Sequence, residues 1–152
     1  MADKPTERLK HYLRGARHWR KEADYLSDEI MQLRSECEKM TTTYSEAPTF
    51  GGFDDHRQAK IAEMIDKQRE YSEKIKLCNN RVQEIQLFID NLYDYNEREV
   101  CELYYILMHD WQTVALKMHY TKRRIDQIHG AALLNLLAIH GKMIENGSRP
   151  LF

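Results

Sequence analysis

Apolar residues recur through the first part of the chain in alternating steps of three and four positions. The first run consists of Leu9, Tyr12, Ala16, Trp19, Ala23, Leu26, Ile30, Leu33, Cys37, Met40 and Tyr44. This spacing places the side chains on one stripe of an α-helix, which is the heptad pattern of a coiled coil. Since such a stripe is buried only against another element, the pattern predicts a long helix with a helical partner.

A second run with the same alternation follows and supplies that partner. Its members are Ile61, Met64, Gln68, Tyr71, Ile75, Cys78, Val82, Ile85, Ile89 and Leu92. Only Gln68 is polar. We therefore expect residues 1–94 to form a long antiparallel helical hairpin, a two-stranded coiled coil, in an all-α protein.

The connection between the two runs is predicted at residues 45–55 (SEAPTFGGFDD), which contain one Pro and two Gly residues and offer Asp54 or Asp55 as an N-cap for the second helix. If the chain folds back there, the two runs form the seam of the hairpin. Each residue of the first run then pairs with a residue of the second so that the numbers of the two paired residues sum to 101. Every layer then joins an a position to a d position, as antiparallel packing requires. A register displaced by one heptad stays open, since Leu33 opposite Gln68 is a weak layer.

The apolar pattern becomes shorter in the last third of the chain. It predicts one helix over residues 97–108, a second from an N-cap at Asp110 to about Met118, and a third from an N-cap at Thr121 to about His140, with Gly141 as the stop. Residues 95–141 are thus expected to form a helix-turn-helix domain, because only about three residues separate the last two helices. Residues 142–152 are expected to be a frayed tail.

Apolar stripes on the last two predicted helices are placed to face each other. They consist of Val114, Ala115 and Met118 on one helix and Ile125, Ile128 and Ala132 on the other. The turn Met118-His119-Tyr120 lacks the Gly that is frequent in such turns, so His119 has to adopt the turn conformation at some energetic cost.

The outer side of the third helix carries the residues that point to DNA. The candidate DNA-binding residues are Lys117, Thr121, Lys122, Arg123, Arg124, Asp126 and Gln127. Side chains of these types near the N-terminus of a recognition helix reach base edges in the major groove, whereas flanking cations such as Lys117 and Arg124, together with Gln112 and Thr113, suit phosphates. Three cations in a first helical turn oppose the helix dipole, which favours an anionic partner there. The alternative is a helical bundle whose basic turn is merely solvated.

Charge is segregated along the chain although the formal net charge is only −1. Residues 1–21 carry seven Lys or Arg against two Asp or Glu, residues 22–110 carry ten against twenty, and residues 111–152 carry six against two. This pattern indicates anionic partners at the two ends, unless it is the ordinary patchiness of solvated helices. A basic stripe of Lys10, Arg14, Arg17 and Lys21 either contacts nucleic acid or an acidic partner, or is a solvated coiled-coil flank.

Motifs for catalysis or metal binding are missing from the sequence. It has no phosphate-binding Gly-rich loop, no HExxH, no nucleophile-elbow Ser motif, and no two histidines spaced i, i+4. Three cysteines without CxxC spacing indicate a reducing compartment, with Cys37 and Cys78 as buried seam residues. No apolar run is long enough to cross a membrane or to act as a signal peptide. We expect a cytoplasmic protein that is not an enzyme, with no cofactor, metal, small-molecule substrate or membrane association.

Residues 98–136, REVCELYYILMHDWQTVALKMHYTKRRIDQIHGAALLNL, resemble a family of phage and prophage proteins related to the RinA/ArpU late-gene transcription regulators. The resemblance lies in the Tyr-Ile-Leu run, the Trp-x-x-Val-Ala helix, the Tyr-Thr entry to the third helix, and the Ile-x-x-Ile-His and Ala-Leu steps. It implies a helical hairpin followed by a domain similar to the fourth region of sigma-70 factors. It further implies control of late or packaging gene expression inside a bacterial host, with host RNA polymerase as a candidate partner.

The sequence therefore leads to the hypothesis of a sequence-specific regulator that binds double-stranded DNA. A homodimer is expected, because about four phosphate-neutralising cations in one helix-turn-helix bind weakly at physiological salt. Apolar residues outside the seam, Ile65, Leu77, Leu87 and Phe88, are available for the C-terminal domain or a second subunit to cover. The competing hypotheses are a coiled-coil interaction protein, such as a packaging adaptor, and an inhibitor of a host nucleic-acid enzyme.

Overall fold

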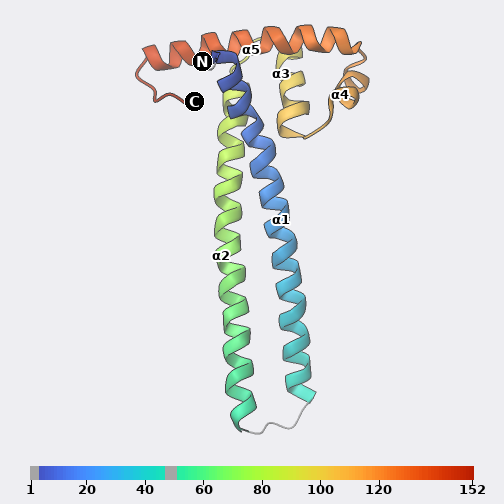
Figure 1. The fold of residues 1–152 in the computed structure, drawn as a ribbon, viewed down its shortest axis with the longest axis vertical. Coiled ribbons are helices and arrows are strands. Elements are labelled where there is room, and N and C mark those ends of the chain that lie inside the picture. The colour runs from blue at the N-terminus through green and yellow to red at the C-terminus, as the bar shows by residue number, and fades with distance from the viewer. Residues whose placement is uncertain (1–3, 47–50) are drawn as a thin grey trace. The chain divides into compact units, whose positions relative to one another are not determined.

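The structure, a computed structural model, describes residues 4–46 and 51–152. Within these ranges the chain is all-helical and has no strand (Figure 1). The elements are α1 (Pro5–Glu46), α2 (Gly51–Ile89), α3 (Tyr95–Cys101), the π-helix η1 (Glu102–Ile106), α4 (Trp111–Met118) and α5 (Lys122–Glu145). The all-α class predicted from the sequence is confirmed. No helix in the described part of the chain is long and apolar enough to cross a membrane.

The predicted connection at 45–55 is only partly correct. Its residues 47–50 lie outside the described residues, whereas α1 continues to Glu46 and α2 already begins at Gly51. Asp54 and Asp55 therefore lie inside α2, and the predicted N-cap at either of them is wrong. Two consecutive Gly residues lower helix propensity, but they do not prevent a long helix from beginning at them.

Contacts divide the chain into two compact units. One consists of residues 1–19 and 80–152, and the other of residues 20–79. The division crosses α1 and α2, whereas the sequence placed the domain boundary between residues 94 and 95. We call the first the head unit and the second the arm unit.

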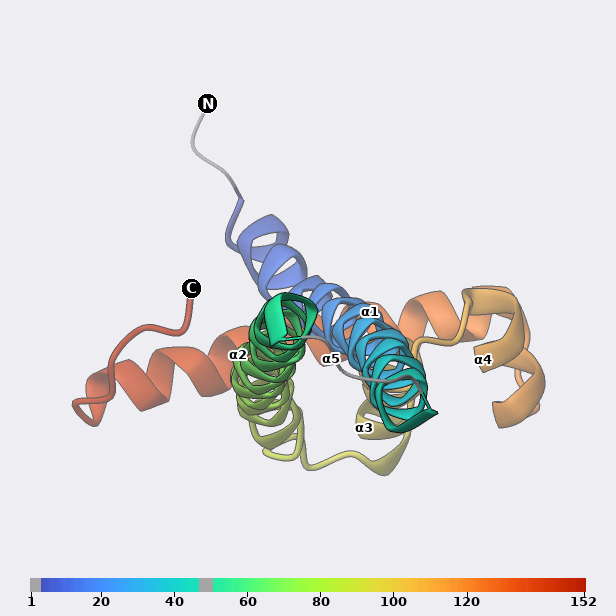
Figure 2. The same cartoon turned by 90° about the horizontal axis from the view of Figure 1, so that it is seen from below.

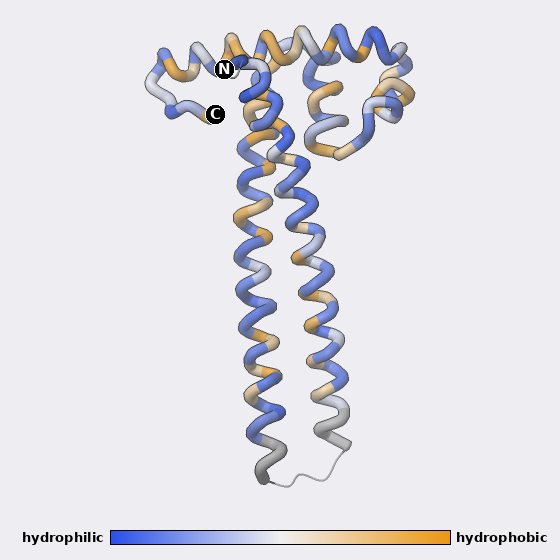
Figure 3. The backbone as a smooth tube through the Cα atoms, in the orientation of Figure 1, coloured by the Kyte–Doolittle hydropathy of each residue, from blue (hydrophilic) through white to orange (hydrophobic). Residues whose placement is uncertain are grey.

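The arm unit consists of the antiparallel segments 20–46 of α1 and 51–79 of α2, which run side by side in Figures 1 and 2. The predicted seam lies between these two segments: Ala23, Leu26, Ile30, Met64 and Cys78 are buried. Cys37, predicted to be buried like Cys78, is only half-buried. Figure 3 shows hydrophobic positions alternating with hydrophilic ones along both helices. Burial raises the pKa of the Cys78 thiol, and the charge of Glu22 raises it further.

A sulfur contact in the arm unit fixes the register of the two helices. Cys37 Sγ lies 3.5 Å from Met64 Sδ, and these are the two residues that the predicted register pairs. Gln68 Nε2 donates to Cys37 Sγ at 3.7 Å, so the polar residue of the second seam has a partner one layer away. The predicted pairing is confirmed here, and a displacement by a whole heptad is excluded.

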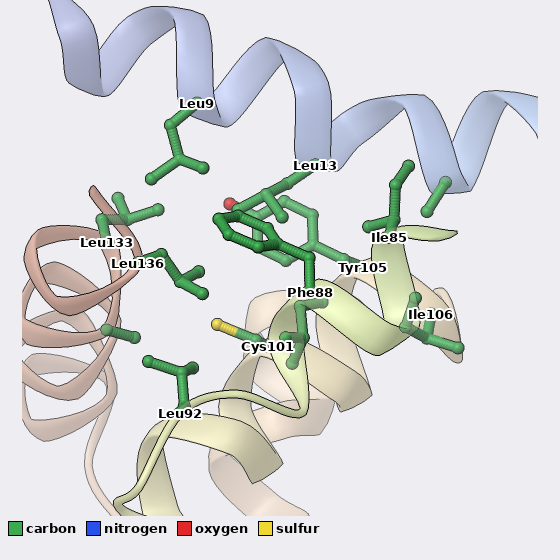
Figure 4. Packing of buried hydrophobic residues seen from close by; sticks show 13 residues of the cluster. Leu9, Leu13, Ile85, Phe88, Leu92, Cys101, Tyr105, Ile106, Leu133 and Leu136 are labelled. Carbon is green, nitrogen blue, oxygen red and sulfur yellow. The ribbon is translucent and has the colours of Figure 1, made fainter. Parts of the chain in front are cut away.

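The head unit has a larger core than a two-helix seam provides (Figure 4). Its buried cluster comprises Leu9, Leu13, Ala16, Ile85, Phe88, Ile89, Leu92, Cys101, Tyr105, Ile106, Ala132, Leu133 and Leu136. Phe88 is only 2% exposed, so residues of the C-terminal region cover it, as one of the two predicted alternatives requires. Leu13 lies off the predicted stripe and is nevertheless fully buried. Ile65, Leu77 and Leu87 are exposed.

The predicted end of the third helix and the predicted tail are both wrong. Helix α5 passes through Gly141 and continues to Glu145. The backbone N–H of Leu151 donates to His140 Nε2 at 3.0 Å, and the Phe152 ring stacks on the His140 ring with a centroid distance of 4.0 Å. Half-buried Met143 and Phe152 pack against the core cluster, and this burial outweighs the local stop signal of a Gly.

Candidate nucleic-acid interface

Helix α4 begins as the sequence predicts. Asp110 has an extended backbone, and its Oδ1 accepts a hydrogen bond from the Thr113 N–H at 2.7 Å. Hydrogen bonding from the Thr113 side chain, and then from the Thr113 N–H, lowers the pKa of the Asp110 carboxyl. An ionised N-cap at this end also interacts favourably with the helix dipole.

The connection from α4 to α5 consists of His119, Tyr120 and Thr121. His119 adopts the left-handed conformation with φ of 59° and ψ of 36°, which a residue with a Cβ atom enters at a cost. The Tyr120 N–H donates to the Ala115 carbonyl at 3.1 Å, which closes the helix end. Thr121 Oγ1 accepts from the Arg124 N–H at 3.2 Å and caps α5, as predicted. His119 thus has the positive φ that the absence of a Gly in the turn led us to expect there.

The two helices are held together by the apolar stripes that the sequence assigned to them. Val114, Ile125 and Ile128 form a second buried cluster with Val100 and Leu103 from the preceding helical segment. The predicted helix 97–108 is replaced by α3 followed by the π-helix η1, and the chain then leaves the helix with a positive φ of 63° at Met108. Because one face of α5 is buried in this way, its opposite face is left to solvent.

All seven candidate DNA-binding residues are exposed, and they gather at one place. Lys117 lies in the last turn of α4, Thr121 is the cap, and the other five occupy the first two turns of α5: Lys122, Arg123, Arg124, Asp126 and Gln127. We call this set the basic tip. Of the two further phosphate candidates, Gln112 is exposed and Thr113 is half-buried.

The charges of the basic tip are not neutralised by neighbouring carboxylates. Among the residues that the structure describes, none of its four cations forms an ion pair within 4.0 Å. Arg124 Nη1 donates to Gln127 Oε1 at 3.5 Å, and its guanidinium lies 5.9 Å from the centroid of the Tyr120 ring. Four cations with a single carboxylate, together with the dipole at the start of α5, produce a positive potential at this end of the helix.

A cluster of ring side chains joins α4 and α5 to the preceding π-helix η1. Tyr104 stacks on Trp111, the first residue of α4, with a centroid distance of 3.8 Å. Trp111 also contacts the His129 ring of α5 at 4.7 Å, and His129 Nε2 lies 2.8 Å from the Tyr105 hydroxyl oxygen. Burial and then the charge of Lys10 lower the pKa of His129 to about 4, so its ring is neutral at physiological pH. The ring cluster therefore positions the helices without adding charge.

The four residues of the basic stripe near the start of the chain have different surroundings in the structure. Arg17 Nη1 donates to the Tyr104 carbonyl at 2.6 Å and to the His109 carbonyl at 3.3 Å. Lys10 forms an ion pair with Glu7 at 3.3 Å. Sequence periodicity grouped these residues but could not identify Arg17 as a ligand of backbone carbonyls, since its partners lie more than eighty positions away. Arg17 is thus occupied within the head unit, while Arg14 and Lys21 are exposed.

No group of three or more His, Cys, Asp or Glu side chains in the described ranges could hold a metal ion. No protein-family model matches the chain, and no curated protein or solved structure gives a significant match.

Proposed function

We propose that this protein binds double-stranded DNA through the basic tip, with α4 and α5 acting as a helix-turn-helix. The observation that carries the proposal is that all seven residues singled out by the sequence are exposed around the α4–α5 connection and the first two turns of α5, while Ile125 and Ile128 of those turns are buried. A cationic helix end whose apolar side is anchored and whose polar side is open is the arrangement that major-groove reading requires.

In this proposal α5 enters the major groove with its first two turns. Arg123 and Gln127 have side chains that form bidentate hydrogen bonds with guanine and adenine, respectively. Lys117, Lys122 and Arg124 neutralise phosphates on the flanks. Thr121 uses its oxygen as the cap, so its hydroxyl proton is available to donate to a phosphate oxygen.

We further propose that DNA binding serves transcription control, as the resemblance to phage late-gene regulators implies, with host RNA polymerase as a candidate partner. The number of cations supports a homodimer. A tip with four cations gives limited affinity at physiological salt, whereas two tips on two half-sites multiply it.

The decisive experiment measures binding to duplex DNA over a series of salt concentrations. The test variant carries Lys122→Ala, Arg123→Ala and Arg124→Ala. The matched control removes three exposed cations of the arm unit by Arg34→Ala, Lys60→Ala and Arg69→Ala, so that both variants have the same net charge. The slope of log K against the logarithm of the salt concentration is negative, and its magnitude falls by about 0.9 for each phosphate that the protein no longer neutralises.

We expect the tip variant to bind DNA more weakly by an order of magnitude or more. Its slope should be shallower than that of the parent by about 2, since the phosphates held by Lys122 and Arg124 are no longer neutralised, while the loss of Arg123 removes a base contact. The control should retain the parent slope. A salt-independent signal in the parent, or equal weakening in both variants, would contradict DNA binding by the basic tip.

Exposed apolar side chains on the arm unit favour the second candidate, a coiled-coil interaction protein. Tyr25, Met31 and Leu77 are each at least 60% exposed. Substituting Leu77 by Gln leaves the buried seam intact and should abolish partner binding if these side chains form a protein interface, with no effect on the DNA slope. This outcome, together with a salt-independent DNA signal, would select the interaction protein over the regulator.

A further inference from the structure

A cleft of about 560 Å³ opens in the head unit between the first turns of α1 and the last two residues of the chain. Five side chains of α1 line it, together with Leu151 and Phe152. None of them belongs to the basic tip. A cleft of this volume is within the range that small-molecule ligands occupy.

The polar wall of the cleft is cationic. Glu7 is the acidic residue there, and its Oε1 already forms an ion pair with Lys10 Nζ at 3.3 Å. The remaining polar lining includes Arg8, His11 and Arg14, and in the described part of the chain neither arginine takes part in an ion pair. After the effect of burial, the charge of Arg8 lowers the pKa of His140. The side of the cleft formed by α1 therefore attracts anions.

Two aromatic rings, one from α1 and one from the end of the chain, complete the lining, and we call them the aromatic wall. The rings of Tyr12 and Phe152 border the cleft with centroids 5.5 Å apart and planes tilted by 36°. Phe152 is fixed from behind by its stack on His140 at 4.0 Å, and the Leu151 N–H donates to the same imidazole. Both rings are half-buried, so part of each ring surface remains open to a ligand. Rings fixed in this way offer a planar group a surface that needs no reorganisation.

We propose that this cleft binds a nucleoside monophosphate, with the phosphate held by Arg8 and Arg14 and the base against Tyr12 and Phe152. Guanidinium groups bind phosphate oxygens through pairs of hydrogen bonds, and aromatic rings stack on a base whatever its identity. Guanidinium groups and aromatic rings that line one nucleotide-sized cleft match both halves of such a ligand. The site uses different residues from the basic tip and stands independently of DNA binding.

The test is calorimetric titration of the full chain with adenosine 5′-monophosphate, adenosine and inorganic phosphate in separate experiments. The monophosphate should bind at least tenfold more tightly than either fragment, because it alone engages both walls. Arg8→Ala combined with Arg14→Ala should lower the affinity for the monophosphate by about tenfold or more, as expected when hydrogen bonds to a charged group are removed. Arg34→Ala combined with Arg69→Ala removes the same charge from the arm unit and should leave the affinity within twofold.

Phe152→Leu tests the aromatic wall, since it keeps an apolar side chain and removes the ring. This variant should bind the monophosphate more weakly and keep the parent's affinity for inorganic phosphate. The single variant Arg8→Ala, with its fold verified by circular dichroism, repeats the charge test with a smaller change. Equal affinity for phosphate and the monophosphate, no binding at millimolar nucleotide, or equal weakening in the arm-unit control would each overturn the proposal. The triple variant of the basic tip should bind the nucleotide like the parent, so failure of either proposal is recognised separately.

Discussion

The guanidinium of Arg17 lies 4.4 Å from the centroid of the Tyr104 ring and donates to the carbonyl oxygen of the same residue at 2.6 Å. It reaches the His109 carbonyl as well, at 3.3 Å. These carbonyls belong to the π-helix and to the segment after it, where the helical hydrogen-bond pattern ends and acceptors need other partners. Because Tyr104 stacks on Trp111, Arg17 connects α1 to the first residue of α4 within the head unit.

Substitution of Arg17 should therefore destabilise the head unit. Arg17→Ala removes two charge-assisted hydrogen bonds and a cation–π contact, and we expect the free energy of unfolding to fall by about 2–4 kcal/mol. Arg17→Lys should recover only a small part of it, since an ammonium group lacks the planar donor pair. Denaturant unfolding followed by Trp fluorescence measures both effects.

Lys21→Ala is the control for Arg17, because it removes an exposed cation of the same stripe. Its free energy of unfolding should stay within about 0.5 kcal/mol of the parent, as is usual for surface substitutions. If the two alanine variants were equally stable, the contacts of Arg17 would contribute nothing measurable.

The buried imidazole of His129 makes stability depend on pH. Burial, followed by the charge of Lys10, lowers its folded-state pKa to about 4, whereas the unfolded chain has the ordinary value of about 6.5. Between these values the unfolded state binds more protons, so stability is fully present above pH 6.5 and decreases as the pH falls toward 4. The stability that disappears over this window is about 3 kcal/mol. The lowered pKa of His140 acts in the same direction.

His129→Gln keeps a polar partner for the Tyr105 hydroxyl and removes the titrating group. Its free energy of unfolding, measured from pH 7 to pH 4, should fall less steeply than that of the parent. His56→Gln makes the same change at an exposed position and should retain the parent slope. Parallel pH profiles for parent and His129→Gln would show that His129 is not the group responsible.

The left-handed turn between α4 and α5 should be improved by Gly. His119 has a φ of 59°, a region that costs a residue with a Cβ atom about 1–2 kcal/mol. A Gly avoids this cost, but its greater freedom in the unfolded chain offsets part of the gain in stability. We expect His119→Gly to raise the free energy of unfolding by about 0.5–1 kcal/mol. His119→Ala retains the Cβ atom and should bring no such gain. Greater stability of the Ala variant than of the Gly variant would mean that the side chain, and not the backbone, sets the cost.

The register of the arm unit can be tested by crosslinking. Since Cys37 Sγ and Met64 Sδ are 3.5 Å apart, Met64→Cys should form an intramolecular disulfide with Cys37 under oxidising conditions. The band shift appears on a non-reducing gel at low protein concentration and disappears on reduction. Tyr71→Cys places the second thiol one heptad away and should not crosslink. Preferential crosslinking of the Tyr71 variant would indicate a displaced register.

Local signals in the sequence predicted a large part of this structure. Asp110 and Thr121 cap their helices as expected, because an N-cap needs only a short side chain and an N–H three residues further on. The seam of the arm unit follows from its heptad spacing, since residues separated by three and four positions share a helix face whatever else is present. The exposed position of the basic tip follows from the same periodicity in α5.

Tertiary packing decided what the periodicity could not. A heptad pattern describes contact between two helices, whereas in the head unit Leu13 and Phe88 pack into a core shared with α3, η1 and α5. Gly141 ends the helix only where no apolar side chain beyond it can be buried. Here Met143 and Phe152, which follow it, pack against the core. The carbonyl partners of Arg17 lie 87 and 92 positions further along the chain. The sequence by itself determined the helical class and which sides of the helices are polar, because these depend on neighbours a few residues apart. The three-dimensional arrangement determined which of those sides are covered, since burial depends on segments that are distant in sequence.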